Sequence, residues 1–453
     1  MIDTKSVKRF FGVNTVRAVP YIGGTIMTIN FIICWAIPIF FMGSVWKYGL
    51  KYPLKPVYEW FEKNESIRSF AHTYVYKGIF TFLYFFHSSF ITHSFIYYQL
   101  DKRHADYFLT SILLIISSSI ALGTVFYYQL TLGYLPYWLI IAYYFSWVGV
   151  GGRIMGAAYA LGHKEGHNQN MYRDWIKNSV GNFFENWLGC FFGNVPYNFS
   201  TSHVFIHHAL DGGTGDTFYE WDIDRTNIGD FMLYVYRIFL HMIGYSSLKY
   251  FSSHNDLSRR DKLTKGVRIY IAVGFAVLLA TKGSLSFVFW IYLQPLMCMT
   301  YFLAFLNIGF HGFIEFDSNG KSIEEVNSTT IIEGEDDYFG EDDHMAHHYH
   351  GTVFYQDLKD HQAKQLERFK EVKASVFRGL SIVELSIFIL LGLWDKLAEH
   401  YVDYSGKLTT EEIKKMLKTR AKTTEISYEE YEEYLSNPTR EARKNITAMK
   451  KRE

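Results

Sequence analysis

Long apolar segments alternate with polar ones along the 453-residue chain. A helix needs roughly 20 mostly apolar residues to cross a bilayer, and residues 19–45, 108–130 and 135–161 meet this requirement. Two further apolar segments, residues 267–280 and 285–306, are separated by a short polar turn and are predicted to form a helical hairpin. The pattern therefore predicts an all-α, multi-span integral membrane protein.

Four other segments are less decisive because polar or charged residues interrupt them. Residues 79–100 are polar enough that, as a span, they must face protein rather than lipid. Residues 168–202 mix aromatic and polar side chains and are expected to lie at the membrane interface or dip into it. Residues 231–251 and 376–394 contain charged side chains, and an interfacial position is favoured for both. The pattern alone leaves the number of spans open.

Composition excludes several other classes of protein. The formal net charge is +0, so no global positive field favours nucleic acid. Cys34, Cys190 and Cys298 are far apart in apolar surroundings and cannot supply a disulfide framework or a cysteine zinc site. The first apolar run follows a basic start and is too long for a cleaved signal peptide, so a retained membrane segment is expected.

Histidine is concentrated in three short segments, 162–167, 203–208 and 344–348. On a helix, residues three or four apart share a face, so each segment is expected to present its imidazoles together. The eight histidines are His163, His167, His203, His207, His208, His344, His347 and His348. Only 18 histidines occur in 453 residues, so two triplets and a pair are hard to obtain by chance.

All three histidine segments are predicted to lie on the same side of the membrane. No confident span separates the first from the second, and two spans separate the second from the third. The basic N-terminus and residues 101–104 share that side if the first four segments all span, and the positive-inside rule then makes it the cytosol. The basic residues between 47 and 68 would then be luminal, so either the first segment does not cross or the rule is broken here.

Imidazole clusters beside a bilayer indicate a metal site. Neutral imidazole binds iron, zinc, copper and nickel, and ionisable side chains next to a membrane are costly and usually functional. Zinc enzymes need three or four ligands, whereas eight or nine imidazoles imply two metals. The His-Glu-x-x-His pattern of zinc proteases is absent, since Glu165 comes one residue too late for it. The ligands are almost purely histidine, unlike the glutamate-rich sets of ferritin-like di-iron proteins.

The order His-x-x-x-His, His-x-x-x-His-His and His-x-x-His-His resembles the membrane fatty-acid desaturase and hydroxylase superfamily, over about residues 105–360. Two details are similar to acyl-CoA desaturases. Asn307 and His311 end the last span, where that family has an Asn-x-x-x-His ligand element, and residues 340–343 are similar to its Gly-Glu-x-x-His approach. The first two boxes each differ from those enzymes by one residue in spacing, which leaves the subfamily open.

The resemblance implies two iron ions that activate O2 and remove hydrogen from an unactivated acyl carbon. It implies nine histidine ligands, the eight above and His311, with Asn307 holding a metal through water. It further implies a lipid or acyl substrate and a separate electron donor, a b-type cytochrome or a ferredoxin with its reductase, because the chain has no His-Pro-Gly-Gly haem motif. The expected reaction is desaturation. The alternatives are a fatty acid, sphingolipid, sterol or carotenoid hydroxylase and, in another class, a non-enzymatic metal-binding membrane protein.

Carboxylates are expected to hold the second nitrogen of each imidazole, as they commonly do around metal-bound histidines. The candidates are Glu165, Asp216, Asp222, Asp224, Glu341 and Asp343. The stretch 221–225 is equally compatible with a solvated turn. His350 follows the third box, and an outer role is favoured for it over direct ligation.

Four regions are predicted along the chain. They are N-terminal membrane segments and a loop at 1–104, the histidine-box catalytic domain at 105–360, an interfacial helix at 361–404 and a charged, helix-prone cytosolic tail at 405–453. Lysines at the third and fourth positions from the end resemble the dilysine retrieval signal of endoplasmic-reticulum membrane proteins. The sequence thus predicts a multi-span helical protein of that membrane with a cytosolic, histidine-rich di-iron cap.

Overall fold

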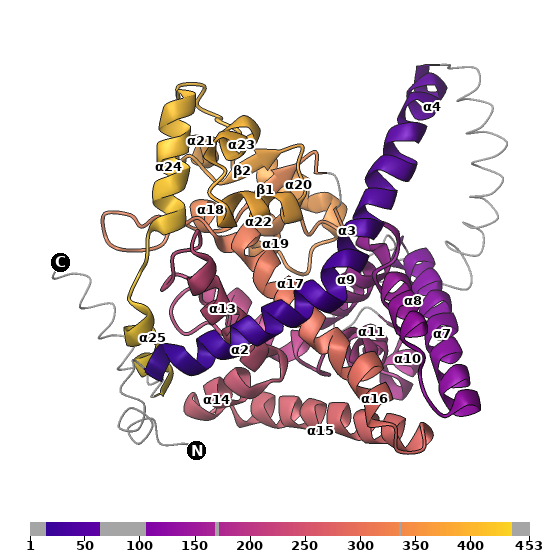
Figure 1. The fold of residues 1–453 in the computed structure, drawn as a ribbon. Helices are drawn as coiled ribbons and strands as arrows, with labels where there is room; N and C mark the ends of the chain where they lie inside the picture. Colours follow the sequence, from indigo (N-terminus) through magenta and orange to yellow (C-terminus); the bar gives the residue numbers. More distant parts are fainter. Residues whose placement is uncertain (1–14, 64–105, 168–171, 335–336, 437–453) are drawn as a thin grey trace. The chain divides into compact units, whose positions relative to one another are not determined.

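The computed structural model describes residues 15–63, 106–167, 172–334 and 337–436, and within them the regular elements are helices and two short strands (Figure 1). The chain forms two compact units. The first unit contains residues 1–31, 195–269 and 296–453, and the second contains residues 32–194 and 270–295. The predicted segment 79–100 and the terminal Lys450 and Lys451 lie outside the described residues.

The second unit contains three consecutive helices, α7 (Asp106–Leu132), α8 (Tyr137–Val148) and α9 (Arg153–His167). α7 ends at Leu132 because Gly133 adopts a φ of +77° and turns the chain. The sequence predicts one helix over 135–161, but the structure has two. Gly149 adopts a φ of +71° after α8, and the helices on either side are bent by 44°. The first histidine pair therefore lies at the end of a separate helix.

Aromatic side chains fill the interior of the second unit. Trp35 stacks on Tyr144 with 4.0 Å between ring centroids, and its indole N–H donates to Gln294. The other elements of this unit are η1 (Ile32–Ala36), α3 (Ile37–Ser44), η2 (Val45–Lys51), α4 (Tyr52–Lys63), η7 (Val150–Gly152), α10 (Asp174–Ser179), α11 (Phe183–Asn186), η8 (Leu188–Phe192), α16 (Leu285–Phe287) and η10 (Val288–Leu293).

In the first unit, α2 (Thr15–Phe31) packs along α13 (Ile228–Met242), as Figure 1 shows. Gly24 permits this close approach, because a Cβ atom at that position would lie 1.8 Å from the carbonyl oxygen of Met232. Asn227 begins α13 by accepting hydrogen bonds from the N–H groups of Gly229 and Asp230. The contact fixes α13, one of the helices that surround the site described below.

The C-terminal helices are part of the first unit. α24 (Thr410–Lys422) is attached through Arg225, whose buried guanidinium donates to the carbonyl oxygens of Arg420 and Thr423 at 2.9 and 2.6 Å. α25 (Tyr428–Ser436) buries Tyr428 and Tyr431. The charged segment beyond residue 405 thus includes an apolar face that packs within the unit.

Two short strands of the first unit, β1 (Thr330–Ile332) and β2 (Val376–Arg378), pair in parallel with Ile331 opposite Phe377. The other elements of this unit are η9 (Phe199–His207), α12 (His208–Leu210), α14 (Tyr245–Ser253), α18 (Glu324–Asn327), α19 (His344–Tyr349), η11 (Tyr355–Asp357), α20 (Leu358–Ala363), α21 (Leu366–Val372), α22 (Ile382–Leu390) and α23 (Trp394–His400). α15 (Leu257–Ala280) and α17 (Gln294–His311) contribute residues to both units.

Four described helices are long and apolar enough to cross a membrane: Val16–Pro56, Thr110–Leu132, Leu257–Ala280 and Leu285–His311. The bent pair formed by α8 and α9 would make a fifth span. The prediction of a helical, multi-span integral membrane protein is confirmed. Residues 231–251 form α13 and α14, and residues 376–394 include β2 and the nine-residue α22, so neither stretch contains one helix of spanning length.

Candidate metal centre

The second histidine segment lies on a π-helix, η9, which continues into the short helix α12. A π-helix bonds residues five apart, so residues i and i+5 come onto the same side. His203 and His208 accordingly meet, with their Nε2 atoms 3.0 Å apart. His207 joins a different group of ligand atoms. The expectation of one shared face for all three is therefore wrong, because the π-helix pairs His203 with His208 while the neighbouring His207 points to the other group.

The third histidine segment forms α19. His344 and His348, four residues apart, have Nε2 atoms 3.1 Å apart. Adjacent residues on an α-helix differ by about 100° in direction, so His347 cannot point the same way as His348. The expected common face therefore holds for His344 and His348, whereas His347 belongs to the other group of ligand atoms. We call the adjacent pairs His207–His208 and His347–His348 the histidine doublets. In each doublet, one histidine belongs to one group of ligand atoms and its neighbour to the other.

Four imidazoles of the first unit form what we call the four-histidine set. Their ligand atoms all lie within 4.8 Å of one another, and their rings are buried or nearly so. The set draws on three elements, with His207 from η9, His311 from the last position of α17, and His344 and His348 from α19. The membrane helix α17 thus ends in a ligand.

Oxygen atoms of the first unit face the Nδ1 atom of three of these imidazoles. The pairs are Asp216 Oδ2 with His207 at 2.8 Å, Asp211 Oδ1 with His348 at 2.9 Å, and the Asn327 carbonyl oxygen with His311 at 3.0 Å. Burial raises the pKa of each aspartate, but the facing imidazoles lower it by more, so both pKa values fall below their usual range. Both aspartates are therefore ionised; Asp216 is placed to accept a hydrogen bond from His207 Nδ1, and Asp211 lies beside His348 Nδ1.

This arrangement fits a bound metal ion. An imidazole with a proton on Nδ1 carries a lone pair on Nε2. The Nε2 atoms of His311 and His344 are 2.9 Å apart, and those of His344 and His348 are 3.1 Å apart. A proton on His344 Nε2 could bridge one of these pairs, and two nitrogen ligands about 2.1 Å from one metal and at right angles to each other would also be about 3.0 Å apart. The donor set therefore suits a cation that prefers imidazole, such as iron.

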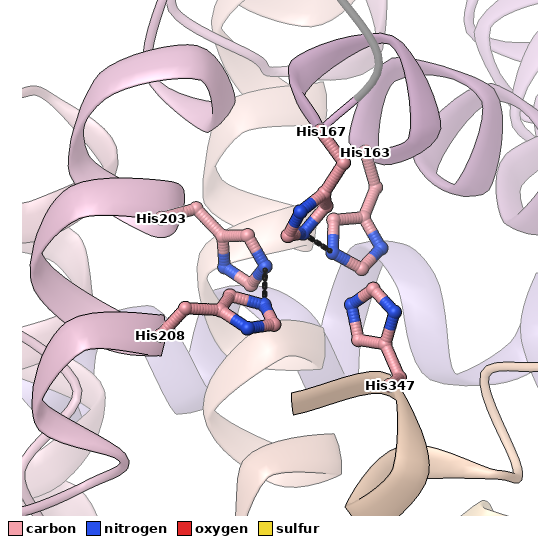
Figure 2. Close-up of side chains that lie close together, drawn as sticks. All are labelled: His163, His167, His203, His208 and His347. Atoms are coloured by element: carbon pink, nitrogen blue, oxygen red, sulfur yellow. Dashed lines mark hydrogen bonds between the residues drawn. The ribbon is translucent and has the colours of Figure 1, made fainter. Parts of the chain in front are cut away.

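A second group of the first unit, the three-histidine set, contains His203, His208 and His347. Their ligand atoms also lie within 4.8 Å of one another. Figure 2 shows the rings of His203 and His208 facing each other from the two ends of the π-helical turn. Three imidazoles on η9, α12 and α19 form the beginning of a second metal site, because most protein-bound transition metals take at least four ligands.

The first histidine pair belongs to the second unit. His163 and His167, four residues apart on α9, have Nε2 atoms 3.1 Å apart (Figure 2). Between them, the buried Glu165 accepts hydrogen bonds from the Tyr172 hydroxyl and the Glu185 N–H at 2.5 and 2.7 Å. The Glu165 carboxylate thereby ties the last turn of α9 to the chain that follows it.

The family of the chain is decided by its middle region. The family model for fatty acid desaturases matches residues 138–380, more than half of the chain, including all three histidine segments. This chain belongs to the fatty acid desaturase family. It is therefore an O2-dependent oxidoreductase of the membrane, and its two histidine clusters are able to bind metal. No curated protein and no solved structure matches the chain.

The desaturase places the remaining candidate residues in different surroundings. Asp222 forms a two-pronged ion pair with Arg237, with both N–O distances 2.8 Å. Asp224 accepts from the N–H and the hydroxyl of Thr226 at 2.9 and 2.7 Å. These two aspartates stabilise the loop and α13. Among the six carboxylates expected to hold imidazoles, Asp216 faces His207 Nδ1 at 2.8 Å.

The other candidates lie near the third box or at the end of α17. Asp343 precedes α19 and accepts a hydrogen bond from Gln362 Nε2 at 2.7 Å. Glu341 is half-buried in the turn before it. Asn307 is buried one helical turn before His311, and its Nδ2 donates to the hydroxyl of Tyr234 at 2.5 Å.

Asp211 is a residue of this desaturase that sequence reasoning missed. It follows α12 with a φ of +48°, an uncommon conformation for a residue with a side chain, and its carboxylate faces His348. Its position three residues after His208 was the available signal in the sequence. That signal was insufficient because the partner, His348, lies 137 residues further along the chain.

Proposed function

We propose that this desaturase-family protein uses two iron ions and O2 to introduce a C=C bond into an acyl chain of a lipid or acyl thioester. The observation that carries the proposal is the division of the two histidine doublets. His207 and His348 belong to one set, and His208 and His347 belong to the other. Such a division suits two metals held side by side by the same two helices.

The proposed ligand assignment follows from counting imidazoles. One iron is held by the four-histidine set, with Asn307 contributing through water. The other iron is held by His203, His208 and His347. Three imidazoles are few for an iron ion, so we assign His163 and His167 to the same iron. The i, i+4 spacing and converging Nε2 atoms of that pair support this assignment.

The residues around the four-histidine set prepare it for a metal. When bound, iron would supply the O2 and electron chemistry needed to remove hydrogen from an unactivated carbon. Asp216 and Asp211 keep the proton of each facing imidazole on Nδ1 and so keep Nε2 free for ligation. The Asn327 carbonyl does the same for His311. Side-chain burial keeps water from competing with these contacts.

The remaining partners are proposed from the family and the sequence. The substrate is an acyl chain in the membrane, and electrons come from a separate b-type cytochrome or from a ferredoxin with its reductase. We place the histidine segments on the cytosolic face of the endoplasmic reticulum. The positive-inside argument supports the cytosolic placement.

A lipid-defined host tests the reaction. The full-length protein is expressed there, and the fatty acids of wild type, His347→Ala and His350→Ala are profiled by mass spectrometry. We expect a new double bond with wild type and with His350→Ala, and none with His347→Ala. Although an outer role was expected for His350, its ring packs against His361 and it belongs to neither set, so this half-buried histidine three residues further on is the matched control.

An isotope experiment separates desaturation from hydroxylation. Under 18O2, a desaturase product carries no label, whereas a hydroxylated acyl chain gains one 18O atom. A labelled hydroxyl group would replace the desaturase assignment with a hydroxylase. Wild-type protein that binds iron and leaves every lipid unchanged would contradict both assignments.

A further inference from the structure

A buried chain of hydrogen bonds runs through the first unit from His207 to Asn307. It begins with Asp216, whose Oδ2 faces His207 and whose Oδ1 accepts the N–H of Phe218 at 2.9 Å. The carbonyl oxygen of Phe218 accepts the hydroxyl of Tyr234 at 3.0 Å, and that hydroxyl accepts Asn307 Nδ2. One end of this hydrogen-bond network is thus His207 of the four-histidine set. The other end is the amide of Asn307, one helical turn before His311 of the same set.

The direction of each bond in this chain follows from counting hydrogen atoms. A tyrosine hydroxyl has one hydrogen to donate. The Phe218 carbonyl can only accept, so the Tyr234 hydrogen is committed to it. The Tyr234 oxygen can then only accept from Asn307, which must present its NH2 group. The amide is therefore fixed with its nitrogen, rather than its oxygen, towards Tyr234. The hydrogen bonds decide this, because the oxygen and the nitrogen of an asparagine amide have nearly the same shape.

The fixed orientation leaves the amide oxygen of Asn307 on the side away from Tyr234. Asn307 and His311 are four residues apart on α17 and so share a face of the helix. His311 contributes its Nε2 atom to the four-histidine set. An acceptor oxygen at Asn307 is what a metal-bound water needs, because such a water donates its hydrogens.

We propose that Tyr234 is a positioning residue that fixes the Asn307 amide so that its oxygen is left for a water molecule on the metal of the four-histidine set. The inference rests on the proposed function, since it requires a metal there. Tyr234 acts through Asn307, whose amide donates to its hydroxyl. Its location on α13, which carries no histidine of either set, explains why no spacing pattern in the sequence indicates it.

Cobalt binding tests this role without relying on activity. The full-length protein, stripped of metal, is titrated with Co2+ and followed by visible absorption. We expect Tyr234→Phe to weaken one of two binding steps by roughly 10- to 100-fold, the usual effect of losing an outer partner of a metal ligand. Tyr219→Phe is the matched control, because it also removes a buried hydroxyl, which donates to Glu425 instead. The control should titrate like wild type.

A double-variant cycle tests whether Tyr234 acts through Asn307. If it does, Tyr234→Phe adds no further loss of Co2+ affinity to Asn307→Ala, because the effects of coupled residues do not add. Additive losses would overturn the inference. A purely structural role would lower the thermal midpoint of both tyrosine variants and leave both Co2+ steps unchanged, which would also overturn it.

Fluorinated tyrosine at position 234 keeps the test available if Tyr234→Phe does not fold. Its hydroxyl has the same size but a less basic oxygen, so it accepts less well from Asn307, and a smaller weakening of the same Co2+ step is expected. An unchanged step would count against the proposal. Wild type that takes up fewer than two Co2+ ions would contradict the proposed function, whereas two ions in wild type with Tyr234→Phe titrating like Tyr219→Phe would contradict the role of Tyr234 alone.

Discussion

The four-histidine set and the three-histidine set receive imidazoles from the same segments, η9 with α12 and α19, yet they are completed differently. The four-histidine set gains His311 from α17, and oxygen atoms of the same unit face three of its rings. The three-histidine set gains no ligand from α17. The first unit alone can therefore assemble one metal site, whereas the other, under our proposal, needs the histidine pair of α9.

The two sets share the segments that hold their ligands, but they differ in the residues that surround those ligands. Each doublet supplies one ligand to each set, so a shift of η9 or α19 would move ligands of both metals together. The oxygen atoms facing Nδ1 of the four-histidine set come from the loop after α12 and from Asn327. Changes confined to that loop should consequently affect one metal more than the other.

The largest expected effect separates the two sets by metal content. His311→Ala should lose the metal of the four-histidine set, and the double variant His163→Ala/His167→Ala should lose the other. Each protein is expected to retain about one of two irons and to lose its activity completely, because both metals are needed for the oxidation. Iron per protein is measured by plasma mass spectrometry after purification. A double variant that keeps both irons would show that the α9 pair does not bind metal.

The next effect tests whether Asp222 supports the fold rather than a metal. Asp222→Asn leaves the buried Arg237 with Glu432 as its remaining charged partner, at 3.0 Å. Removing one partner of a buried pair typically costs about 3 kcal/mol, so the thermal midpoint should fall clearly while metal affinity is retained. Lys422→Met is the control, since its 3.6 Å contact with Asp224 is solvent-exposed and worth little. Equal losses for both variants would argue against this role.

A third effect, of similar size, depends on pH and involves Glu220 in the same loop. Its carboxyl group is fully buried, and this burial raises its pKa from 4.5 to about 8. Below about pH 4.5 the carboxyl group is neutral whether the chain is folded or unfolded. As the pH rises towards 8 the unfolded chain loses this proton first, so stability falls. Glu220→Gln should remove that fall and add on the order of 3 kcal/mol at pH 7.

Thermal unfolding of both proteins at several pH values measures this effect. Wild type and Glu220→Gln should unfold at similar temperatures near pH 4.5, and the variant should be increasingly more stable towards pH 8. A difference that does not change with pH would show that Glu220 has an ordinary pKa in the folded protein.

Most of the fold could be predicted from the sequence because membrane spans depend on local composition. The apolar segments at 108–130, 267–280 and 285–306 correspond to helices of spanning length. The bend at Gly149 was not predicted, because hydropathy averages over a window and does not register the φ of one glycine. The burial of Tyr428 and Tyr431 was also unforeseen, since the charged residues around them dominate the local pattern.

The identity of the metal-binding residues was easier to predict than their grouping. Histidine spacing indicated a two-metal centre, but the pairing of His203 with His208 depends on the π-helix at η9, which has no clear signature in the sequence. Asp216 was among the expected partners of the imidazoles, whereas Asp211 and Tyr234 were not. Both act on residues more than 70 positions away in the chain, at distances over which single-sequence patterns carry no information.

The smallest expected effect tests the contrast between the sets most directly. Asp216→Asn keeps the size of the side chain but removes its charge, and its NH2 group can donate to His207 Nδ1. That would place the imidazole proton on Nε2, the nitrogen needed for ligation. Co2+ affinity at the four-histidine set should fall by roughly 10- to 100-fold, while the second binding step stays unchanged. The readout is the same absorption titration.

Asp224→Asn is the matched control for Asp216→Asn. Asp224 belongs to the same loop and was equally expected to hold an imidazole, but its carboxylate is engaged by Thr226 and lies near Lys422. Its substitution should change both Co2+ steps by no more than about twofold, as for partly exposed positions in general. If the two variants titrate alike, Asp216 does not hold His207 for the metal. The oxygen atoms facing the four-histidine set would then give it no advantage in metal binding over the three-histidine set.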